Sequence, residues 1–230
     1  MPVLILAGGL AKRIHSITKN MPKALIQICG KPFIDWQLRY LAKNGIQKVI
    51  LCLGHMGKDI EKYVESGDRY NLKVEYSYDG SKLLGTGGAI KKALPLLDKH
   101  FFVLYGDSFL PIDYSEVYNA FLKNKKTPTM TIYKNNNNLD KSNVIYENNI
   151  LIEYNKNLKK PNMKYIDYGL SILNTDIFNS YKKNINFDLS EVMYDLSIKN
   201  KLIGFPINKR FYEIGSHDGI RDTELFLKNF

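Results

Sequence analysis

Short apolar runs and segments with one apolar face alternate along the first hundred residues of the chain. Runs of this kind, bounded by glycines or polar residues, are typical of buried parallel strands. They predict strands at residues 3–6, 48–53, 74–78 and 101–105. The intervening segments predict helices at residues 32–44, 58–66 and 87–97. Strands separated by helices in this way indicate right-handed crossovers and a parallel sheet.

The pattern is less regular after residue 128. It predicts strands at residues 129–133, 144–147, 151–154 and 165–173 and a final helix at residues 217–228. We therefore expect an α/β fold, namely a single-domain Rossmann-like α/β/α sandwich with a mixed, mostly parallel central sheet. The domain comprises residues 1–230, with a regular first half at residues 1–127 and a mixed second half at residues 128–230.

The charge distribution and the cysteine content limit the classes of function that the sequence supports and indicate the cellular compartment. The formal net charge is +10, but the lysines are scattered and form only small clusters near residues 123–126 and 156–160. This distribution favours a solvated basic surface over the basic stripe with exposed aromatic residues that is typical of nucleic-acid-binding modules. Cys29 and Cys52 each lie in an apolar stretch, which predicts buried thiols in a reducing compartment and excludes a cysteine-based zinc site.

The apolar opening of the chain does not have the features of a targeting or membrane segment. It has no basic leading segment, and Gly8 and Gly9 interrupt it. No apolar run approaches the roughly 18 residues that are needed to cross a bilayer. We expect a cytoplasmic protein with no membrane partner and no nucleic-acid partner.

The first predicted strand leads into a turn that could bind an anion. Gly8 and Gly9 follow it after Ala7, and Arg13 follows four residues later. Consecutive glycines allow a ligand to approach backbone N–H groups, and arginine supplies a permanent planar charge for phosphate oxygens. The spacing matches neither a Walker loop nor the G-x-G-x-x-G dinucleotide pattern. In an open α/β sheet, ligands bind beyond the carboxyl ends of the strands, where this turn is expected.

Several further segments, taken in order, resemble one family along nearly the whole chain. They are LAGGLAKR at residues 6–13, MPKAL at 21–25, GKPFI at 30–34, LGTGGA at 84–89, YGDS at 105–108, IEYNK at 152–156, IDYGL at 166–170 and FYEIGS at 211–216. Together they resemble the sugar-1-phosphate nucleotidylyltransferase family, in particular its small bacterial branch acting on heptose, mannose or N-acetylmuramate 1-phosphates. The chain departs from the family at Ala11, where a glycine is usual, at Asn155, where a glutamate is usual, and at Glu213, where aspartate is commoner.

The resemblance implies a role for each matching residue. Residues 1–127 would bind the nucleotide and residues 128–230 the sugar phosphate. Catalysis is assigned to Arg13, Lys23 and Asp107. Nucleotide binding is assigned to Leu6, Ala7, Gly8, Gly9, Arg13, Lys23, Gly85 and Gly88. The sugar phosphate is assigned to Lys156, Tyr168 and Gly169, and a Mg²⁺ cofactor to Asp107 and Glu213.

The resemblance also implies the reaction and its partners, a nucleoside triphosphate and a sugar 1-phosphate. The phosphate oxygen of the sugar would attack the α-phosphorus and release pyrophosphate, with the protein supplying position and charge rather than a nucleophile. By analogy we expect GTP and a manno-configured heptose or hexose 1-phosphate, giving a nucleotide sugar for surface-glycan biosynthesis. UTP or CTP with another sugar 1-phosphate is the alternative. The predicted helix containing Trp36 suggests a homodimer.

Three alternative functions have less support in the sequence. Glycosyltransferases usually carry Asp-x-Asp after a strand, whereas Asp107 is followed by Ser108 and Phe109. A catalytically silent nucleotide-sugar-binding relative need not keep the metal carboxylates. A nucleic-acid-binding module is suggested by net charge alone.

Overall fold

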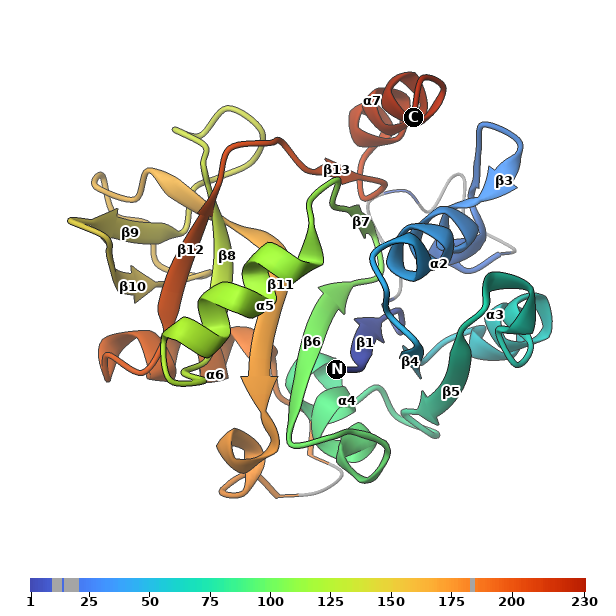
Figure 1. The fold of residues 1–230 in the computed structure, drawn as a ribbon, viewed down its shortest axis with the longest axis horizontal. Helices are drawn as coiled ribbons and strands as arrows, with labels where there is room; N and C mark the ends of the chain where they lie inside the picture. Colours follow the sequence, from blue (N-terminus) through green and yellow to red (C-terminus); the bar gives the residue numbers. More distant parts are fainter. Residues whose placement is uncertain (10–13, 15–20, 183–184) are drawn as a thin grey trace.

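A computed structural model describes residues 1–9, 14, 21–182 and 185–230 of the chain. Most of the described strands belong to one sheet of nine strands (Figure 1). Its strands are β1 (Val3–Leu6), β4 (Lys48–Leu53), β5 (Lys73–Tyr78), β6 (His100–Tyr105), β8 (Thr129–Lys134), β9 (Val144–Glu147), β10 (Ile150–Tyr154), β11 (Tyr165–Asn174) and β12 (Ile203–Ile207). Two small ribbons lie apart from it, β2 (Gln27–Ile28) with β3 (Lys31–Pro32) and β7 (Ser108–Phe109) with β13 (Tyr212–Glu213).

The pairing of the strands divides the sheet into a parallel part and a mixed part. Strands β6, β1, β4 and β5 lie side by side in that order and are all parallel. Strand β11 then pairs antiparallel with β6, β8 and β9, and β12 pairs parallel with β8. The predicted mixed α/β/α sheet is therefore confirmed. The proposed division at residue 127 stays a prediction. The β11–β6 pairing joins residues on both sides of it in one continuous sheet.

Helices cover both faces of the sheet. The helices are α2 (Phe33–Lys43), α3 (Gly57–Val64), α4 (Gly85–Ala93), α5 (Tyr114–Lys123), α6 (Leu189–Ile198) and α7 (His217–Leu227). Helices α2, α3 and α5 share one apolar core with the strands, and α4 and α6 share a second core. Alternate residues of β1 point into opposite cores, with Val3 and Ile5 in the first and Leu4 in the second. This arrangement produces the three layers.

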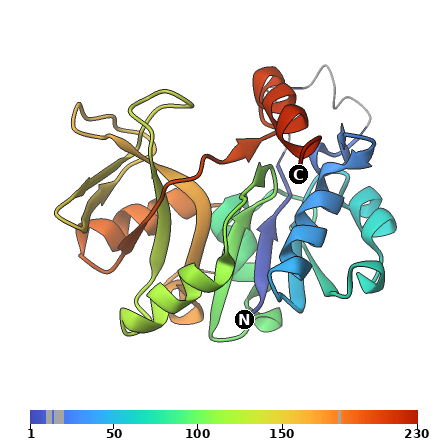
Figure 2. The same cartoon turned by 45° about the horizontal axis from the view of Figure 1, so that its top comes forward.

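Helix α7 lies apart from both layers, beside β13 (Figure 2). Its first turn is capped by Ser216, whose hydroxyl accepts a hydrogen bond from Gly219 N. A third, smaller apolar cluster beneath it joins Phe109, Ile214 and Leu227. Figure 2 shows β1 running toward the side of the molecule on which β13 and α7 lie. The packing of α7 thus fixes the end of the chain against the strand ends.

The structure corrects several expectations from the sequence. Helices α5 and α6 were not predicted, although each begins at an aspartate with a glutamate three residues later, Asp113 with Glu116 and Asp188 with Glu191. That spacing favours a helix start. Cys29 is exposed rather than buried, whereas Cys52 is buried as predicted. No helix among the described residues is both long and apolar enough to cross a membrane.

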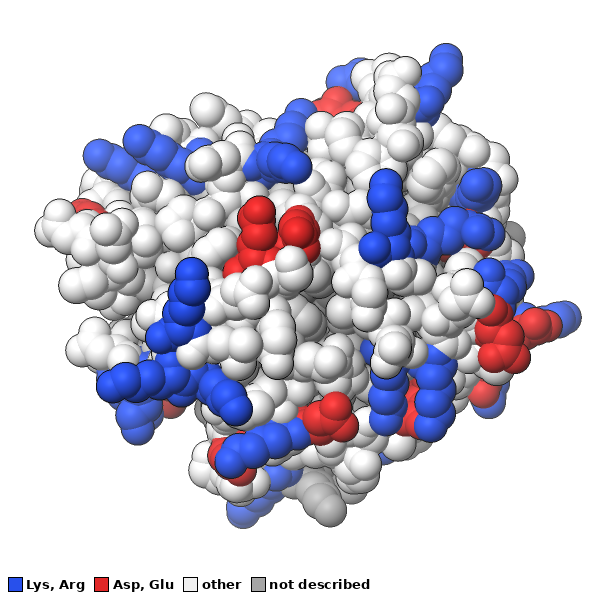
Figure 3. Space-filling view, viewed as in Figure 1, with Lys and Arg blue, Asp and Glu red and all other residues white. Residues whose placement is uncertain are grey.

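The charged side chains are mixed on the face seen in Figure 3. Lysine and arginine are spread over it, with aspartate and glutamate between them, and they form no continuous basic stripe on this face. Several of the lysines form ion pairs along their own element or with a neighbouring strand, as Lys58 does with Glu61 and Lys48 does with Glu75. Ion pairs of this kind are typical of a solvated charged surface.

Candidate active site

A cavity of about 660 Å³ lies beyond the carboxyl ends of the parallel strands. The residues that follow β1, β5 and β6 contribute to it, together with the first turn of α4 and the residue before α6. Its lining consists of Leu6, Ala7, Gly8, Gly9, Lys23, Ala24, Cys52, Asp79, Leu83, Gly85, Thr86, Ala89, Tyr105, Gly106, Asp107, Asp188 and Gly215. This is the edge of an open α/β sheet where ligands bind.

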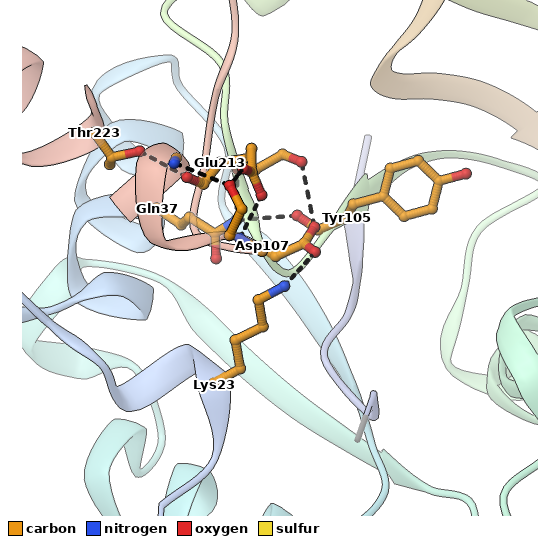
Figure 4. A network of polar contacts seen from close by, with 10 residues as sticks. Lys23, Gln37, Tyr105, Asp107, Glu213 and Thr223 are labelled. Atoms are coloured by element: carbon orange, nitrogen blue, oxygen red, sulfur yellow. Dashed lines mark hydrogen bonds and ion pairs between the residues drawn. The ribbon is translucent and has the colours of Figure 1, made fainter. Parts of the chain in front are cut away.

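Lys23 and Asp107 form an ion pair in this cavity. Lys23 Nζ lies 2.7 Å from Asp107 Oδ2, and the side chains are 16% and 34% exposed. Lys23 begins a short helical turn after the glycine loop, and Asp107 is the second residue after the end of β6. Figure 4 shows the Lys23 side chain extending from below toward the Asp107 carboxylate. Both groups stay partly solvated, so an anion can approach Lys23 and a cation can approach Asp107.

Glu213 is joined to Asp107 through the backbone. Strand β13 pairs with β7, and the carbonyl oxygen of Asp107 accepts a hydrogen bond of 3.0 Å from Ile214 N. The Glu213 carboxylate accepts hydrogen bonds from Gly215 N and from Ser216 Oγ, the latter at 2.6 Å (Figure 4). It therefore supports the loop before α7, and Gly215 of that loop lines the cavity.

The carboxylates of Asp107 and Glu213 are of the ligand type that Mg²⁺ prefers. Within the described part of the chain, no group of three or more His, Cys, Asp or Glu side chains could hold a metal ion. Mg²⁺ does not need such a cage, since it commonly binds one or two carboxylates and takes its other ligands from substrate phosphates and water. Glu213 on β13 and Asp107, the residue before β7, form a partial set of this type.

The glycines at the start of α4 have different roles. Gly85 lines the cavity at φ +70°, a conformation that side chains rarely adopt, and a Cβ there would meet Phe187 O at 2.5 Å. The N–H groups of Gly87 and Gly88 donate to the same carbonyl, at 3.0 and 3.3 Å. Gly88, assigned to the nucleotide from the sequence, thus lies behind the cavity wall and binds the chain segment before α6.

Asp188 links the two halves of the chain at the cavity wall. It caps α6 by accepting from Ser190 N, and it also accepts from Thr86 Oγ1 at 3.2 Å and from Lys156 Nζ at 2.9 Å. Burial acts to raise the pKa of Asp188, but the hydrogen bonds from Lys156 and Ser190 outweigh it and lower the pKa. Lys156 does not itself line the cavity, yet this ion pair holds it against a residue that does.

Strand β11 presents Asp167 rather than Tyr168 toward this region. Tyr168 is buried in the first core, and its hydroxyl donates to Arg210 O. Asp167 accepts from Gly169 N at 2.9 Å and from the hydroxyl of Tyr105, a cavity residue, at 3.3 Å. Burial raises the pKa of the Asp167 carboxyl to about 6, although those two hydrogen bonds act to lower it.

The structure thus brings together only part of the predicted set. Leu6, Ala7, Gly8, Gly9, Lys23, Gly85 and Asp107 line one cavity. Lys156 and Glu213 each lie one hydrogen bond behind it, through Asp188 and through Gly215, and Gly169 lies two hydrogen bonds behind it, through Asp167 and then Tyr105. Gly88 and Tyr168 bind other parts of the protein, and Arg13 and Ala11 lie outside the described residues.

Four polar cavity residues were not singled out from the sequence: Asp79, Thr86, Tyr105 and Asp188. Asp79 and Tyr105 stand at the ends of β5 and β6, so the rule about strand ends could have found them. Asp188 carries a capping signal that predicts a helix start, but no sequence signal places it beside Thr86 and Lys156.

Comparison with known proteins shows the family of the chain. The model of the family described as "Nucleotidyl transferase" matches residues 2–193. The chain is 31% identical over 217 residues to the D-glycero-alpha-D-manno-heptose 1-phosphate guanylyltransferase of Campylobacter jejuni, covering 94% of this chain and 95% of the relative. It is 29% identical over 233 residues to the enzyme of the same name from Aneurinibacillus thermoaerophilus, over the full length of both.

A solved structure extends the likeness to three dimensions. The HddC protein of Yersinia pseudotuberculosis, determined in complex with GMP-PN, superposes with a TM-score of 0.79 at 25% identity, covering 98% of this chain and 99% of that one. The family model covers most of the chain, and the relatives match it from end to end. The chain therefore belongs to the nucleotidyl transferase family and is a sugar-1-phosphate nucleotidyltransferase.

Proposed function

We propose that this protein transfers GMP from GTP to a manno-configured heptose or hexose 1-phosphate with the help of Mg²⁺. The products are pyrophosphate and a GDP-sugar for surface-glycan biosynthesis, made in the cytoplasm where nucleoside triphosphates are supplied. The observation that carries the reaction is the single cavity in which Gly8, Gly9, Lys23 and Asp107 meet. The choice of GTP and of a heptose is supported by the names of two full-length relatives and by the guanine nucleotide analogue in the Yersinia structure.

The reaction forms one P–O bond and breaks another. An oxygen of the sugar phosphate attacks the α-phosphorus of GTP, and the bond from that phosphorus to the bridging oxygen of the β-phosphate breaks. Two anions must meet, so the main task of the protein is to bring them into line and to balance their charge. Lys23, which pairs with Asp107 in the cavity, would neutralise phosphate oxygens, and Lys156, held by Asp188, is assigned to the attacking phosphate.

A bound Mg²⁺ would supply a further counter-charge. Asp107 and Glu213 are the residues that would hold it, and the ion would supply Lewis-acid stabilisation of charge on the phosphates. Asp107 reaches the cavity directly, whereas Glu213 is held beside it by the β7–β13 ribbon. The protein itself contributes position and charge and no nucleophile.

Two other assignments keep the same site. UTP or CTP with a different sugar 1-phosphate would use the same cavity and the same Lys23–Asp107 pair. A silent binding relative would have no need of Asp107 opposite Lys23, and the retained pair favours an enzyme. A homodimer stays a proposal, resting on α2, where the Trp36 ring lies partly buried with Lys31 Nζ above it at 5.0 Å.

The deciding experiment is pyrophosphate release by purified protein with four nucleoside triphosphates and a panel of sugar 1-phosphates. We expect release with GTP and a manno-configured heptose or hexose 1-phosphate, and loss of release when EDTA removes Mg²⁺. Release that requires UTP or CTP would contradict the proposed base. Nucleotide binding without release from any pair would favour the silent relative.

A further inference from the structure

Gln37 is a buried polar side chain of α2 that contacts the turn carrying Asp107. It is 2% exposed, although it lies on the face of the helix that packs against the sheet. Its Nε2 donates to Tyr105 O at 3.1 Å and to Ser108 O at 2.8 Å (Figure 4). These two carbonyls stand on either side of Gly106 and Asp107. One side-chain amide therefore joins both ends of the turn that holds the Asp107 carboxylate.

The orientation of this amide follows from its partners. Carbonyl oxygens only accept hydrogen bonds, so the group that faces Tyr105 O and Ser108 O is the NH₂ group, with both hydrogens in use. Gln37 Oε1 is left buried with no hydrogen-bond partner in the described part of the chain. A buried carbonyl oxygen without a donor costs stability. What the amide contributes at this place is therefore its pair of donors.

The Ser108 carbonyl needs a donor from α2 because it faces away from β13. Asp107 O accepts a hydrogen bond of 3.0 Å from Ile214 N and so points toward β13. Successive carbonyls of a strand point to opposite sides, which directs Ser108 O toward α2, where Gln37 meets it. Helix α2 and strand β13 thus hold consecutive peptide groups of the turn from opposite sides.

Strand β1 holds the turn on a third side. Gly106 N donates to Leu6 O at 3.0 Å, and a Cβ on Gly106 would meet that oxygen at 2.6 Å. The backbone of the turn is therefore fixed by three elements, whereas the Asp107 side chain is 34% exposed and pairs with Lys23. A carboxylate that stays open on a fixed backbone is preorganised for a charged ligand.

We propose that Gln37 is a positioning residue that holds the Asp107 carboxylate in place for Mg²⁺ and nucleotide. The inference rests on the proposed Mg²⁺-dependent transfer and adds a residue that touches neither the metal nor a substrate. Without its two donors the ends of the turn are no longer joined, and Asp107 shifts relative to Lys23. Residues that orient a metal ligand through hydrogen bonds typically change metal affinity or activity by roughly 10- to 100-fold.

Gln37→Met tests this role, because methionine removes both donors and keeps an unbranched side chain that suits a helix. We expect kcat for pyrophosphate release to fall roughly 10- to 100-fold. The Mg²⁺ concentration at half-maximal rate should rise, and KM for the sugar 1-phosphate should stay near its wild-type value. Tyr40→Phe is the matched control, since it removes a hydrogen bond of 3.0 Å from the same helix to Ile112 O. It should keep the wild-type kcat and Mg²⁺ dependence, whatever its effect on Tm.

A second measurement needs no turnover. The protein is titrated, without sugar, with the triphosphate that it binds most tightly, which the proposed function expects to be GTP. The dissociation constant in EDTA divided by that in excess Mg²⁺ isolates the contribution of the metal. This ratio should be closer to one in Gln37→Met than in wild type or Tyr40→Phe. Adding Gln37→Met to Asp107→Asn should leave the ratio unchanged, because the positioned carboxylate is then absent.

Gln37→Glu is the second variant, since a carboxylate of the same shape donates no hydrogen bond when ionised. It should reproduce the losses of Gln37→Met. If neither variant folds, Gln37 serves the fold and the inference is overturned.

Three further outcomes would overturn the inference. They are wild-type kcat and Mg²⁺ dependence in Gln37→Met, an equal loss from Gln37→Met with and without Asp107→Asn, and a wild-type nucleotide affinity that Mg²⁺ does not change. A metal contribution that depends on Gln37, with no product from any pair of substrates, would leave the inference standing and reject the proposed function.

Discussion

Lys23 Nζ lies 2.7 Å from Asp107 Oδ2, although 84 positions separate the two residues in the chain. The pair joins the segment after the glycine turn to the residues after β6, at the carboxyl ends of the parallel strands. Each partner has the charge that suits one component of the proposed reaction, phosphate for Lys23 and Mg²⁺ for Asp107. We expect the pair to exchange partners when Mg²⁺ and nucleotide bind.

Asp107→Asn should lower kcat by roughly 100- to 1,000-fold, because it removes an electrostatic ligand while keeping the size of the side chain. The measurement is pyrophosphate release at saturating substrates over a range of Mg²⁺ concentrations. Asp98→Asn removes the same charge from an exposed position and should leave kcat unchanged. Equal activity of Asp107→Asn and wild type would show that Asp107 has no role in catalysis.

Asp188→Asn should raise KM for the sugar 1-phosphate on the order of 10-fold and leave KM for the nucleotide near its wild-type value. Asparagine caps a helix about as well as aspartate, so α6 is preserved while the charge that holds Lys156 is lost. Steady-state kinetics with each substrate varied in turn gives the two constants.

Asp195→Asn is the control for that variant, since it breaks an exposed ion pair with Lys199 on the same helix. It should change neither KM. A parallel rise of both constants in Asp188→Asn, accompanied by a lower Tm, would indicate that Asp188 serves only the fold.

Asp167 should make stability depend on pH. Its pKa is raised from 3.8 to about 6 by burial, so between these values the folded state binds more protons than the unfolded state. The contribution of Asp167 to the free energy of unfolding therefore falls as pH rises from about 4 to about 6. Asp167→Asn lacks this dependence, and its amide can still accept from Gly169 N and donate to Tyr105.

The measurement is urea denaturation of both proteins at several pH values from 4.5 to 7.5. We expect the variant to gain stability relative to wild type as pH rises, with the change complete near pH 7. A difference that is constant across this range would show that Asp167 titrates normally.

Gly85→Ala should cost more stability than Gly45→Ala. Both glycines have a left-handed backbone, with φ of +70° and +76°, so both substitutions carry the conformational cost of about 1 kcal/mol. At Gly45 a Cβ meets nothing within 4 Å, whereas at Gly85 it meets Phe187 O at 2.5 Å. Urea denaturation should show roughly 1–3 kcal/mol of extra loss for Gly85→Ala, with a drop in nucleotide affinity. Equal losses would mean that the segment around Phe187 yields to the added carbon.

The sequence by itself determined the parallel half of the fold. The structure has strands at the predicted residues 3–6 and 48–53 and a helix within one residue of the predicted 32–44. These elements are readable because each buries a continuous or regularly spaced apolar pattern, which local sequence records. The residues that follow such strands line one cavity, since parallel strands bring their carboxyl ends to one edge.

The tertiary structure alone decided which side chains of the second half reach that edge. In β11 the register against β8 shifts between Asp167 and Ser171, and Gly169 has φ of +104°. Adjacent residues of a strand point to opposite faces, so Asp167 meets the cavity residue Tyr105 while Tyr168 enters the first core with Leu170 and Ile172. Only the pairing of β11 beside β6 decides which of the two faces meets the cavity. Thr86, Lys156 and Asp188 likewise meet only through folding, because alternation and helix signals are local whereas a polar contact between distant segments depends on how they pack.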